Sequence, residues 1–286
     1  MENTRMMAAM KRPIASLSCL ALLFGQSLAS EPTPFPEPLR ETRPAVDGFN
    51  TKLSFEGGPT FGGGEVYGAS GSATIPLGHQ FGLQLDGVVG AVDGNAIDGV
   101  EVFAGATHLF WRDPSLGLIG VYASAIHANV FGGLNVYRGG VEGAVYSGRL
   151  TIEGIIGVFH ADFSDTDFFA DAELGYYPDD DVRLSIGYGV VADDHVFKFG
   201  GEWAFARDAG TASSTFVDGY VNADGDGLAI AGLRFYFGQN AKTLIRRHRE
   251  DDPPSARLGA INFHFSRNQT YGDSCDACTD AYSSTH

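Results

Sequence analysis

A two-residue alternation of side-chain character across residues 49–237 constrains the fold of this chain more than any other feature. Leu184 and Ile186, for example, alternate with Arg183 and Ser185. Successive side chains of a β-strand point to opposite faces, so each such segment has one apolar face and one polar face. The alternation predicts an all-β protein made of antiparallel strands.

Each alternating segment ends in a cluster of Gly, Asp, Asn or Pro, and compact pairs such as Gly78-His79 and Ser147-Gly148 are typical of tight hairpins. Glycine, at 39 of 286 residues, is abundant, which disfavours helices and suits hairpins. We expect about twelve strands, although ten or fourteen would also fit. The expected strands are Phe49–Pro59, Glu65–Leu77, Phe81–Val92, Gly99–Trp111, Leu116–Ala128, Leu134–Tyr146, Leu150–Phe159, Asp167–Tyr177, Val182–Val191, His195–Phe205, Thr215–Asn222 and Leu228–Phe237.

The N-terminal residues 1–29 have the features of a signal peptide. Basic residues precede an apolar stretch, and Ser27-Leu28-Ala29 supplies the small residues that a signal peptidase requires. Cys19 would suit a lipoprotein, but apolar residues continue beyond it. Residues 30–48 form a Pro-rich leader that we expect to be extended and to lie in the periplasm.

Charge and hydropathy then limit the classes of function. The formal charge of −16 argues against nucleic acid as a partner, which calls for a basic surface. Nothing after residue 30 is apolar for the ~18 residues that a transmembrane helix needs. The exported chain is therefore expected to be soluble, peripheral or a membrane-spanning barrel.

The composition of the polar face favours the membrane barrel. That face carries mainly Gly, Ser, Thr and Ala, and its charges have both signs, whereas a water-washed exterior is usually dense in Lys and Glu. We predict a transmembrane antiparallel up-and-down β-barrel over residues 49–237, with the apolar face toward lipid. A soluble lipocalin-like barrel and a β-sandwich are the alternatives. The predicted lumen charges are Lys52, Glu56, Glu101, Arg138, Glu142, Glu153, Asp171, Glu173, Arg183, Lys198, Glu202 and Arg234, and the predicted interfacial aromatics are Tyr67, Phe110, Tyr176, Trp203 and Phe237.

The run from Gly232 to Phe237 resembles the closing strand of bacterial outer-membrane β-barrels, a superfamily within which the chain looks porin-like. The resemblance implies that Leu233, Phe235 and Phe237 face outward and form the signal read by the barrel-assembly machinery. In that superfamily the strand usually ends the protein, whereas here residues 238–286 follow. These residues are expected to be a polar periplasmic tail, unless residues 262–265 form a later closing strand.

Other motifs are weaker. Residues 222–227 resemble half of a calcium loop but lack its final acidic ligand, so a hairpin turn is expected instead. Cys275 and Cys278 suggest a small disulfide, with a redox pair or half a metal site as alternatives. The basic residues between 242 and 249 would contact lipid phosphates or belong to a solvated helix. No cofactor, metal site or catalytic residue is predicted.

The sequence predicts a Gram-negative outer-membrane protein of structural or porin-like role, with outer-membrane lipids as its surroundings. It could pass small polar solutes or cations, or be the outer-membrane part of an export or polysaccharide-secretion apparatus with envelope partners. The lumen charges could brace a closed barrel or line a pathway. The alternatives are a lipid-modifying hydrolase, for which His108 and His195 would be tested first, and a soluble barrel that binds an apolar ligand.

Overall fold

The structure is a computed structural model that describes residues 43–94, 99–130, 132–162, 165–192 and 194–253. Its elements are twelve strands and one short helix. They are β1 (Asn50–Pro59), β2 (Gly64–Leu77), β3 (Phe81–Gly94), β4 (Val100–Asp113), β5 (Gly117–Ala128), β6 (Leu134–Ser147), β7 (Leu150–Ala161), β8 (Asp167–Asp179), β9 (Val182–Val191), β10 (Asp194–Asp208), β11 (Thr211–Asn222), β12 (Gly227–Phe237) and α1 (Leu244–Glu250).

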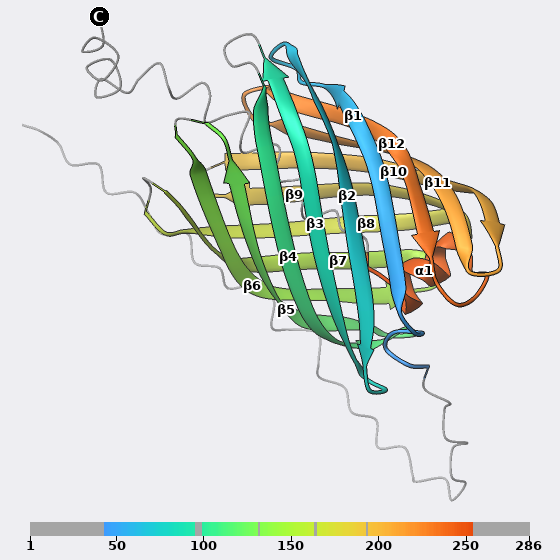
Figure 1. Ribbon diagram of the computed structural model, residues 1–286. Coiled ribbons are helices and arrows are strands. Elements are labelled where there is room, and N and C mark those ends of the chain that lie inside the picture. The colour runs from blue at the N-terminus through green and yellow to red at the C-terminus, as the bar shows by residue number, and fades with distance from the viewer. Residues whose placement is uncertain (1–42, 95–98, 131, 163–164, 193, 254–286) are drawn as a thin grey trace, which may run out of the picture. The chain divides into compact units, whose positions relative to one another are not determined.

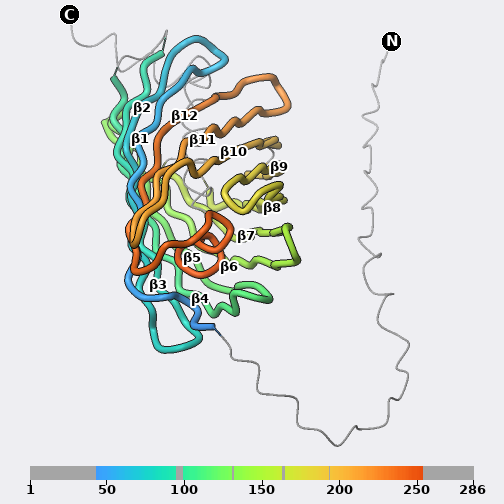
Figure 2. The backbone as a smooth tube through the Cα atoms, turned by 90° about the vertical axis from the view of Figure 1, so that its right-hand side faces the viewer, coloured from blue at the N-terminus to red at the C-terminus, as the bar shows by residue number. Residues whose placement is uncertain are grey.

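The strands form one closed antiparallel barrel. Each strand pairs with its neighbours in the chain, and β1 pairs with β12 to close the ring, with Thr51 opposite Phe237 and Phe55 opposite Leu233. Figure 1 shows the blue strand β1 beside the orange strand β12, and Figure 2 follows the consecutive strands around the wall. The predicted fold class and the count of twelve strands are confirmed.

The two ends of the barrel differ in their connections. The terminal mouth is the end where β1 begins and β12 ends, and its turns are residues 78–80, 114–116, 148–149, 180–181 and 209–210. The loop mouth is the opposite end, with connections 60–63, 95–99, 129–133, 162–166, 192–193 and 223–226. The shorter connections therefore lie on the side that holds both ends of the barrel. At the loop mouth, residues 222–227 form a hairpin turn in which the Asn222 side chain accepts the backbone N–H groups of Asp224 and Asp226.

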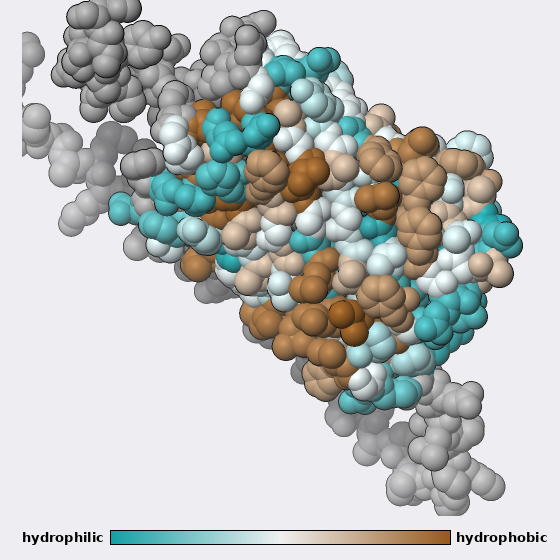
Figure 3. Space-filling model, viewed as in Figure 1, coloured by the Kyte–Doolittle hydropathy of each residue, from teal (hydrophilic) through white to brown (hydrophobic). Residues whose placement is uncertain are grey.

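The outward face is apolar along its whole circumference. Ile186 is 65% exposed, and Leu233 and Phe237, two of the three residues that the resemblance placed on this face, are 48% and 46% exposed. Apolar side chains spread over the visible wall in Figure 3, with polar ones toward its margins. Tyr67, Tyr176, Trp203 and Phe237 also point outward near strand ends, but the expectation for Phe110 was wrong. Phe110 shares the inward side of β4 with His108 and Arg112, and it packs against Val46 in a buried cluster.

The inner wall is layered. Toward the loop mouth it is apolar, whereas ionised side chains occupy the middle and the half near the terminal mouth. A polar interior was expected throughout, so the apolar layer near the loop mouth departs from that expectation. The inward side chains of the apolar layer include Val66, Val92, Val102, Tyr122, Ile126, Ile155, Phe169, Phe216, Tyr220 and Leu228.

The strand ends agree with the predicted ones within a few residues except in the β10–β11 hairpin. We expected β11 to begin at Thr215, but it begins at Thr211, and β10 continues to Asp208 past a register shift between Ala204 and Ala206. The polar run between these strands resembled a loop in the sequence. Its backbone nevertheless continues the ladder, because Ala212 and Ser214 still fill the inner side of the wall.

No helix in the described ranges is long and apolar enough to cross a bilayer. The expected signal peptide, most of the Pro-rich leader, residues 262–265, and Cys275 and Cys278 lie outside the described residues.

A charge on the outward face should destabilise the barrel in a bilayer. We expect Ile186→Arg to lower the free energy of unfolding by about 2–4 kcal/mol, the usual cost of Arg at the bilayer midplane. Urea titration of the protein folded into phospholipid vesicles measures this loss. Ala209→Arg, in an exposed turn, is the matched control and should have little effect. Equal losses in the two variants would show that Ile186 does not face hydrocarbon.

Candidate functional site: the lumen and its closed mouth

Strands β7 to β10 contribute an ion cluster to the lumen. The Arg183 guanidinium lies 2.8 Å from a Glu153 oxygen and 2.6 Å from a Glu173 oxygen. The Lys198 ammonium lies 2.5 Å from Asp171 and 3.7 Å from Glu173. Arg183, Lys198 and Glu173 are buried, so little solvent screens these pairs. Five of the predicted lumen charges therefore form one connected cluster.

A second cluster joins β10 and β12. Arg234 contacts Glu202 at 2.5 Å and donates a hydrogen bond to the Ser54 hydroxyl. Ser214 and Tyr236 each donate a hydrogen bond to the other carboxylate oxygen of Glu202, at 2.6 Å. With three polar partners the buried Glu202 carboxylate is well compensated for its loss of water.

The inward glycines of this wall leave room for the long charged side chains. A Cβ atom at Gly175 would lie 3.1 Å from Arg183 Nε, and one at Gly187 would lie 3.0 Å from Lys198 Cε. The charged side chains thus lie along the wall, over neighbouring strands, where a larger residue would push them toward the barrel axis.

The remaining predicted lumen residues are placed differently. A Glu142 carboxylate oxygen lies 2.9 Å from Nδ1 of His108, and an Asp86 carboxylate oxygen lies 3.1 Å from Nε2 of the same ring. Glu56 faces inward beside Gly232. Glu101 is not brought into the lumen, because it is exposed on the outward side of β4 and accepts a hydrogen bond from Asn129.

Arg138 faces inward without a carboxylate partner among the described residues. Its guanidinium carbon lies 6.0 Å from the Phe159 ring centre and 5.5 Å from that of Phe169. Asp86, His108 and Asp218 also face inward, although none of them was among the predicted lumen residues. The alternation within β3, β4 and β11 contains the signal that assigns them to this face.

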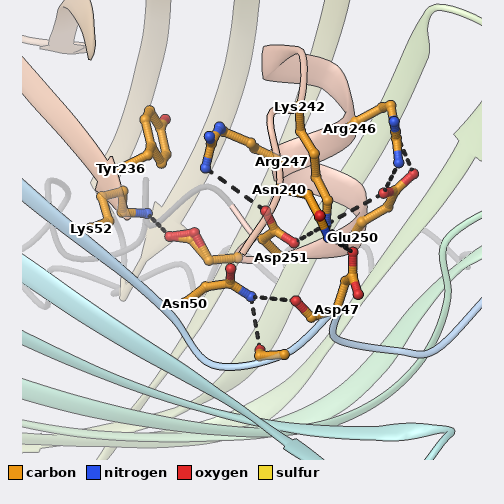
Figure 4. Close-up of polar contacts among 12 residues, drawn as sticks. Asp47, Asn50, Lys52, Tyr236, Asn240, Lys242, Arg246, Arg247, Glu250 and Asp251 are labelled. Atoms are coloured by element: carbon orange, nitrogen blue, oxygen red, sulfur yellow. Dashed lines mark hydrogen bonds and ion pairs between the residues drawn. The ribbon is translucent and has the colours of Figure 1, made fainter. Parts of the chain in front are cut away.

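The terminal mouth is filled by residues 242–252, which we call the plug. The plug consists of α1 and the residues on either side of it, and most of its side chains are buried. Figure 1 shows α1 at the end where β12 stops, and Figure 4 shows its polar contacts with the barrel. Residues 242–252 thus turn back into the mouth of the barrel, and they are the first part of the stretch 238–286 that was expected to be a polar periplasmic tail.

Asp252 fixes the end of the plug to the first two strands. Its carboxylate lies 2.6 Å from the Lys52 ammonium and accepts the Ser72 hydroxyl at 3.1 Å. Both Lys52 and Asp252 are almost fully buried. Lys52, predicted as a lumen charge, therefore pairs with the plug in place of a charge on the barrel wall.

Lys242 links the plug to the segment before β1. Its ammonium pairs with Asp47 at 2.9 Å, with Glu250 at 3.5 Å and with Asp251. The Asp47 backbone N–H also donates to the Glu250 carbonyl at 3.0 Å. The segment that precedes β1 and the segment that follows β12 are thus bound to each other in the terminal mouth.

Arg112, on β4, contacts both the segment before β1 and the plug. It donates to the carbonyl of Ala45 at 2.5 Å and to that of Asp251 at 2.9 Å. Arg249 donates to the carbonyls of Gly148 and Leu150 in the β6–β7 hairpin. Contacts on several sides of the mouth therefore hold the plug.

His248 connects the plug to the hydrogen-bond network of the lumen. Its Nδ1 lies 2.8 Å from the Tyr177 hydroxyl and its Nε2 lies 3.2 Å from the Tyr236 hydroxyl. The Tyr236 hydroxyl already donates to Glu202, so His248 donates to Tyr236 from Nε2 and accepts from Tyr177 at Nδ1. Burial lowers the pKa of His248 well below 6.5, against the opposing attraction of Glu202.

The acids of the plug respond to burial in different ways. Burial raises the pKa of Asp251 to about 6, although Lys242 acts in the other direction. The pKa of Glu250 is lowered overall. Burial acts to raise it, but the Arg246 hydrogen bond and the charge of Lys242 outweigh that effect. The hydrogen bond from Lys242 lowers the pKa of Asp47.

The basic run from 242 to 249 was expected either to contact lipid phosphates or to lie in a solvated helix. Lys242 and Arg247 are instead buried inside the mouth, Arg249 is partly buried and Arg246 is half exposed. Of the two histidines considered for a hydrolase, His108 lies in the lumen cluster with Asp86, and His195 lies beside the Tyr188 hydroxyl near the loop mouth.

Comparison with known proteins identifies the fold. No protein-family model and no curated protein matches the chain. Among solved structures, the KdgM porin in complex with disordered oligogalacturonate is 11% identical, with a TM-score of 0.50 over 64% of this chain and 98% of the porin. The COG4313 outer membrane channel from Pseudomonas putida F1 is 12% identical, with a TM-score of 0.47 over 71% of this chain and 99% of the channel. The translocator domain of autotransporter NalP from Neisseria meningitidis is 14% identical, with a TM-score of 0.44 over 66% and 88% of the two chains.

Removal of Arg183 should destabilise the barrel strongly. Arg183→Met leaves the Glu153 and Glu173 carboxylates buried without their main counterion, which typically costs about 3–5 kcal/mol. Urea titration in vesicles measures the loss. The triple variant Arg183→Met/Glu153→Gln/Glu173→Gln, which removes the stranded charges, should recover most of it. No recovery would mean that the packing of Arg183, and not its charge, matters.

The contribution of His248 to stability should depend on pH. The buried imidazole stays neutral while a released one binds a proton, so its contribution is present above pH 6.5 and is lost as the pH falls below that value. The difference in melting temperature between the parent protein and His248→Gln should therefore shrink on acidification. A difference that grows toward low pH would contradict a buried neutral His248.

Proposed function

The chain has the fold of outer-membrane β-barrels, and we propose that it is a channel whose terminal mouth is closed by its own plug in the state described. The observation that carries this proposal is the set of buried ion pairs between the plug and the mouth, with Asp252 on Lys52 and Lys242 on Asp47. A barrel whose lumen is filled by the side chains of its own strands does not require an additional charged segment to close its mouth.

The terminal mouth would face the periplasm. An even number of strands places both ends of the barrel on one side, and outer-membrane barrels have their short turns on the periplasmic side. The shorter turns of this chain are at the terminal mouth. The plug would then control exit from the lumen into the periplasm, and the loop mouth would face the cell exterior.

The way the plug is held suits a segment that can leave. Its attachments are mainly ion pairs and hydrogen bonds, which water can replace once the mouth opens. Burial penalises every one of these charges, so the net stabilisation by such pairs is much smaller than their number suggests. Among its anchoring residues, Lys52 and Lys242 each bridge the plug to the segment around β1.

The fold shared with the KdgM porin supports a role in passage of solutes. Without the plug, the described inward side chains of the barrel wall include more acidic than basic residues. This excess of negative charge favours cations over small inorganic anions along an open pathway. Passage of small polar solutes is the function that this geometry supports best.

Conductance in planar bilayers tests the proposal. The parent protein should be mostly closed, and the double variant Lys52→Met/Lys242→Met should open more often and to a higher conductance, because the plug loses its two lysine anchors. Arg149→Met is the matched control. Arg149 is half exposed, lies outside the plug and pairs with the exposed Asp180, so the control should behave as the parent protein does.

Two outcomes would refute the closed-channel proposal. One is a parent protein that is already fully conducting and does not change in the double variant. The other is a double variant that folds, as its heat-modifiable gel migration shows, yet remains as closed as the parent.

A further inference from the structure

Arg138 differs from the other inward cations on the barrel wall. Lys52, Arg183, Lys198 and Arg234 each contact a carboxylate, and Arg112 donates to two carbonyl oxygens. Within the described part of the chain, Arg138 has neither kind of contact, although it is only 8% exposed. Its Nε atom is buried without a hydrogen-bond partner.

A buried guanidinium without an anion is costly, and the two phenylalanine rings compensate only in part. Contact between a cation and an aromatic ring is worth about 0.5–2 kcal/mol, and the ring centres of Phe159 and Phe169 lie at 6.0 and 5.5 Å. Asp171 attracts Arg138 through its charge but is already bonded to Lys198 at 2.5 Å. The hydrogen-bonding capacity of Arg138 is therefore largely unused.

Arg138 lies closer to the loop mouth than to the terminal mouth. It is the fifth residue of β6 counted from that mouth, and it is directly paired with Phe159 near the end of β7. Phe169 is the third residue of β8 from the same mouth. The three side chains lie at the base of the apolar layer, which includes Tyr122, Ile126 and Phe169.

We propose that Arg138, Phe159 and Phe169 form a binding site for a small organic monocarboxylate with an apolar body. The planar fork of Arg138 matches a carboxylate in a bidentate arrangement. The phenylalanine rings and the apolar layer receive the rest of the ligand, as is usual for small-molecule sites with one charged group in apolar surroundings. The idea that such a monocarboxylate is a transported solute rests on the channel proposal, whereas the idea that it binds at Arg138 does not.

The charge of the surroundings selects a single negative charge. Beyond Arg138 toward the terminal mouth lie Asp171, Glu173 and Glu142, so a ligand with several charges would meet repulsion that one carboxylate on Arg138 avoids. A neutral ligand would leave the guanidinium unpaired, and a cationic one would be repelled by it.

Calorimetric titration of the full mature chain in detergent micelles tests the site with benzoate and hexanoate. Both carboxylates should bind, and benzyl alcohol, hexan-1-ol and phthalate should bind much more weakly. Arg138→Met should weaken benzoate binding about tenfold or more, as expected for the loss of a charge-assisted hydrogen bond. Arg138→Lys should lie between the two, since it keeps the charge and loses the fork.

Arg149→Met is the matched control. Arg149 is a half-exposed arginine at the terminal mouth, paired with Asp180, and its removal should leave benzoate binding unchanged. Because Arg138→Met could fail to fold, a second measurement uses the unaltered sequence. Benzoate should shift the Arg138 Nε–H resonance of protein labelled with ¹⁵N-arginine, and benzyl alcohol should not.

The proposal is overturned if neither carboxylate binds, if benzyl alcohol binds as tightly as benzoate, or if folded Arg138→Met retains the affinity of the parent. These outcomes leave the conductance result untouched. Conversely, a barrel that never conducts but binds benzoate through Arg138 would refute the channel and keep the site.

Discussion

The pairing of β1 with β12 is the constraint on which the rest of this structure depends. A sheet in hydrocarbon has no water to satisfy its edge N–H and C=O groups, so the ladder must close on itself. Closure makes one face the outside and the other an enclosed lumen. Buried charges such as Arg183 and Glu202 can persist only because that lumen supplies partners for them.

Much of this architecture follows from the sequence because the alternation has a period of two. The ends of β9 were predicted to the residue, and the inward positions of Arg183, Lys198 and Arg234 follow from the same rule. The predicted facing of a side chain was wrong where it was taken from residue type and not from the alternation within its strand. Phe110 was expected at the membrane interface because it is aromatic and close to a strand end, yet its place in the alternation of β4 puts it inside.

The plug was not foreseen, for a different physical reason. A run with Lys242, Arg247 and Asp251 is hydrophilic, and such runs are usually solvated. Their burial depends on partners far away in the chain, including Asp47, Lys52 and Arg112. No local pattern encodes a pairing across some two hundred residues, so only the closed barrel reveals it. The same holds for Arg138, whose lack of a counterion cannot be read from its neighbours in the chain.

The joint anchoring of the segments before β1 and after β12 has a consequence for biogenesis. Asp47 and Glu250 are bonded to each other through the backbone, and both flank strands that meet only at the seam. In a nascent chain whose first and last strands are still apart, these residues are separated by the width of an open sheet. The plug can therefore fill the mouth only after β1 and β12 have paired. The filled mouth is thus a built-in marker of a closed barrel, and an incompletely assembled molecule cannot acquire it.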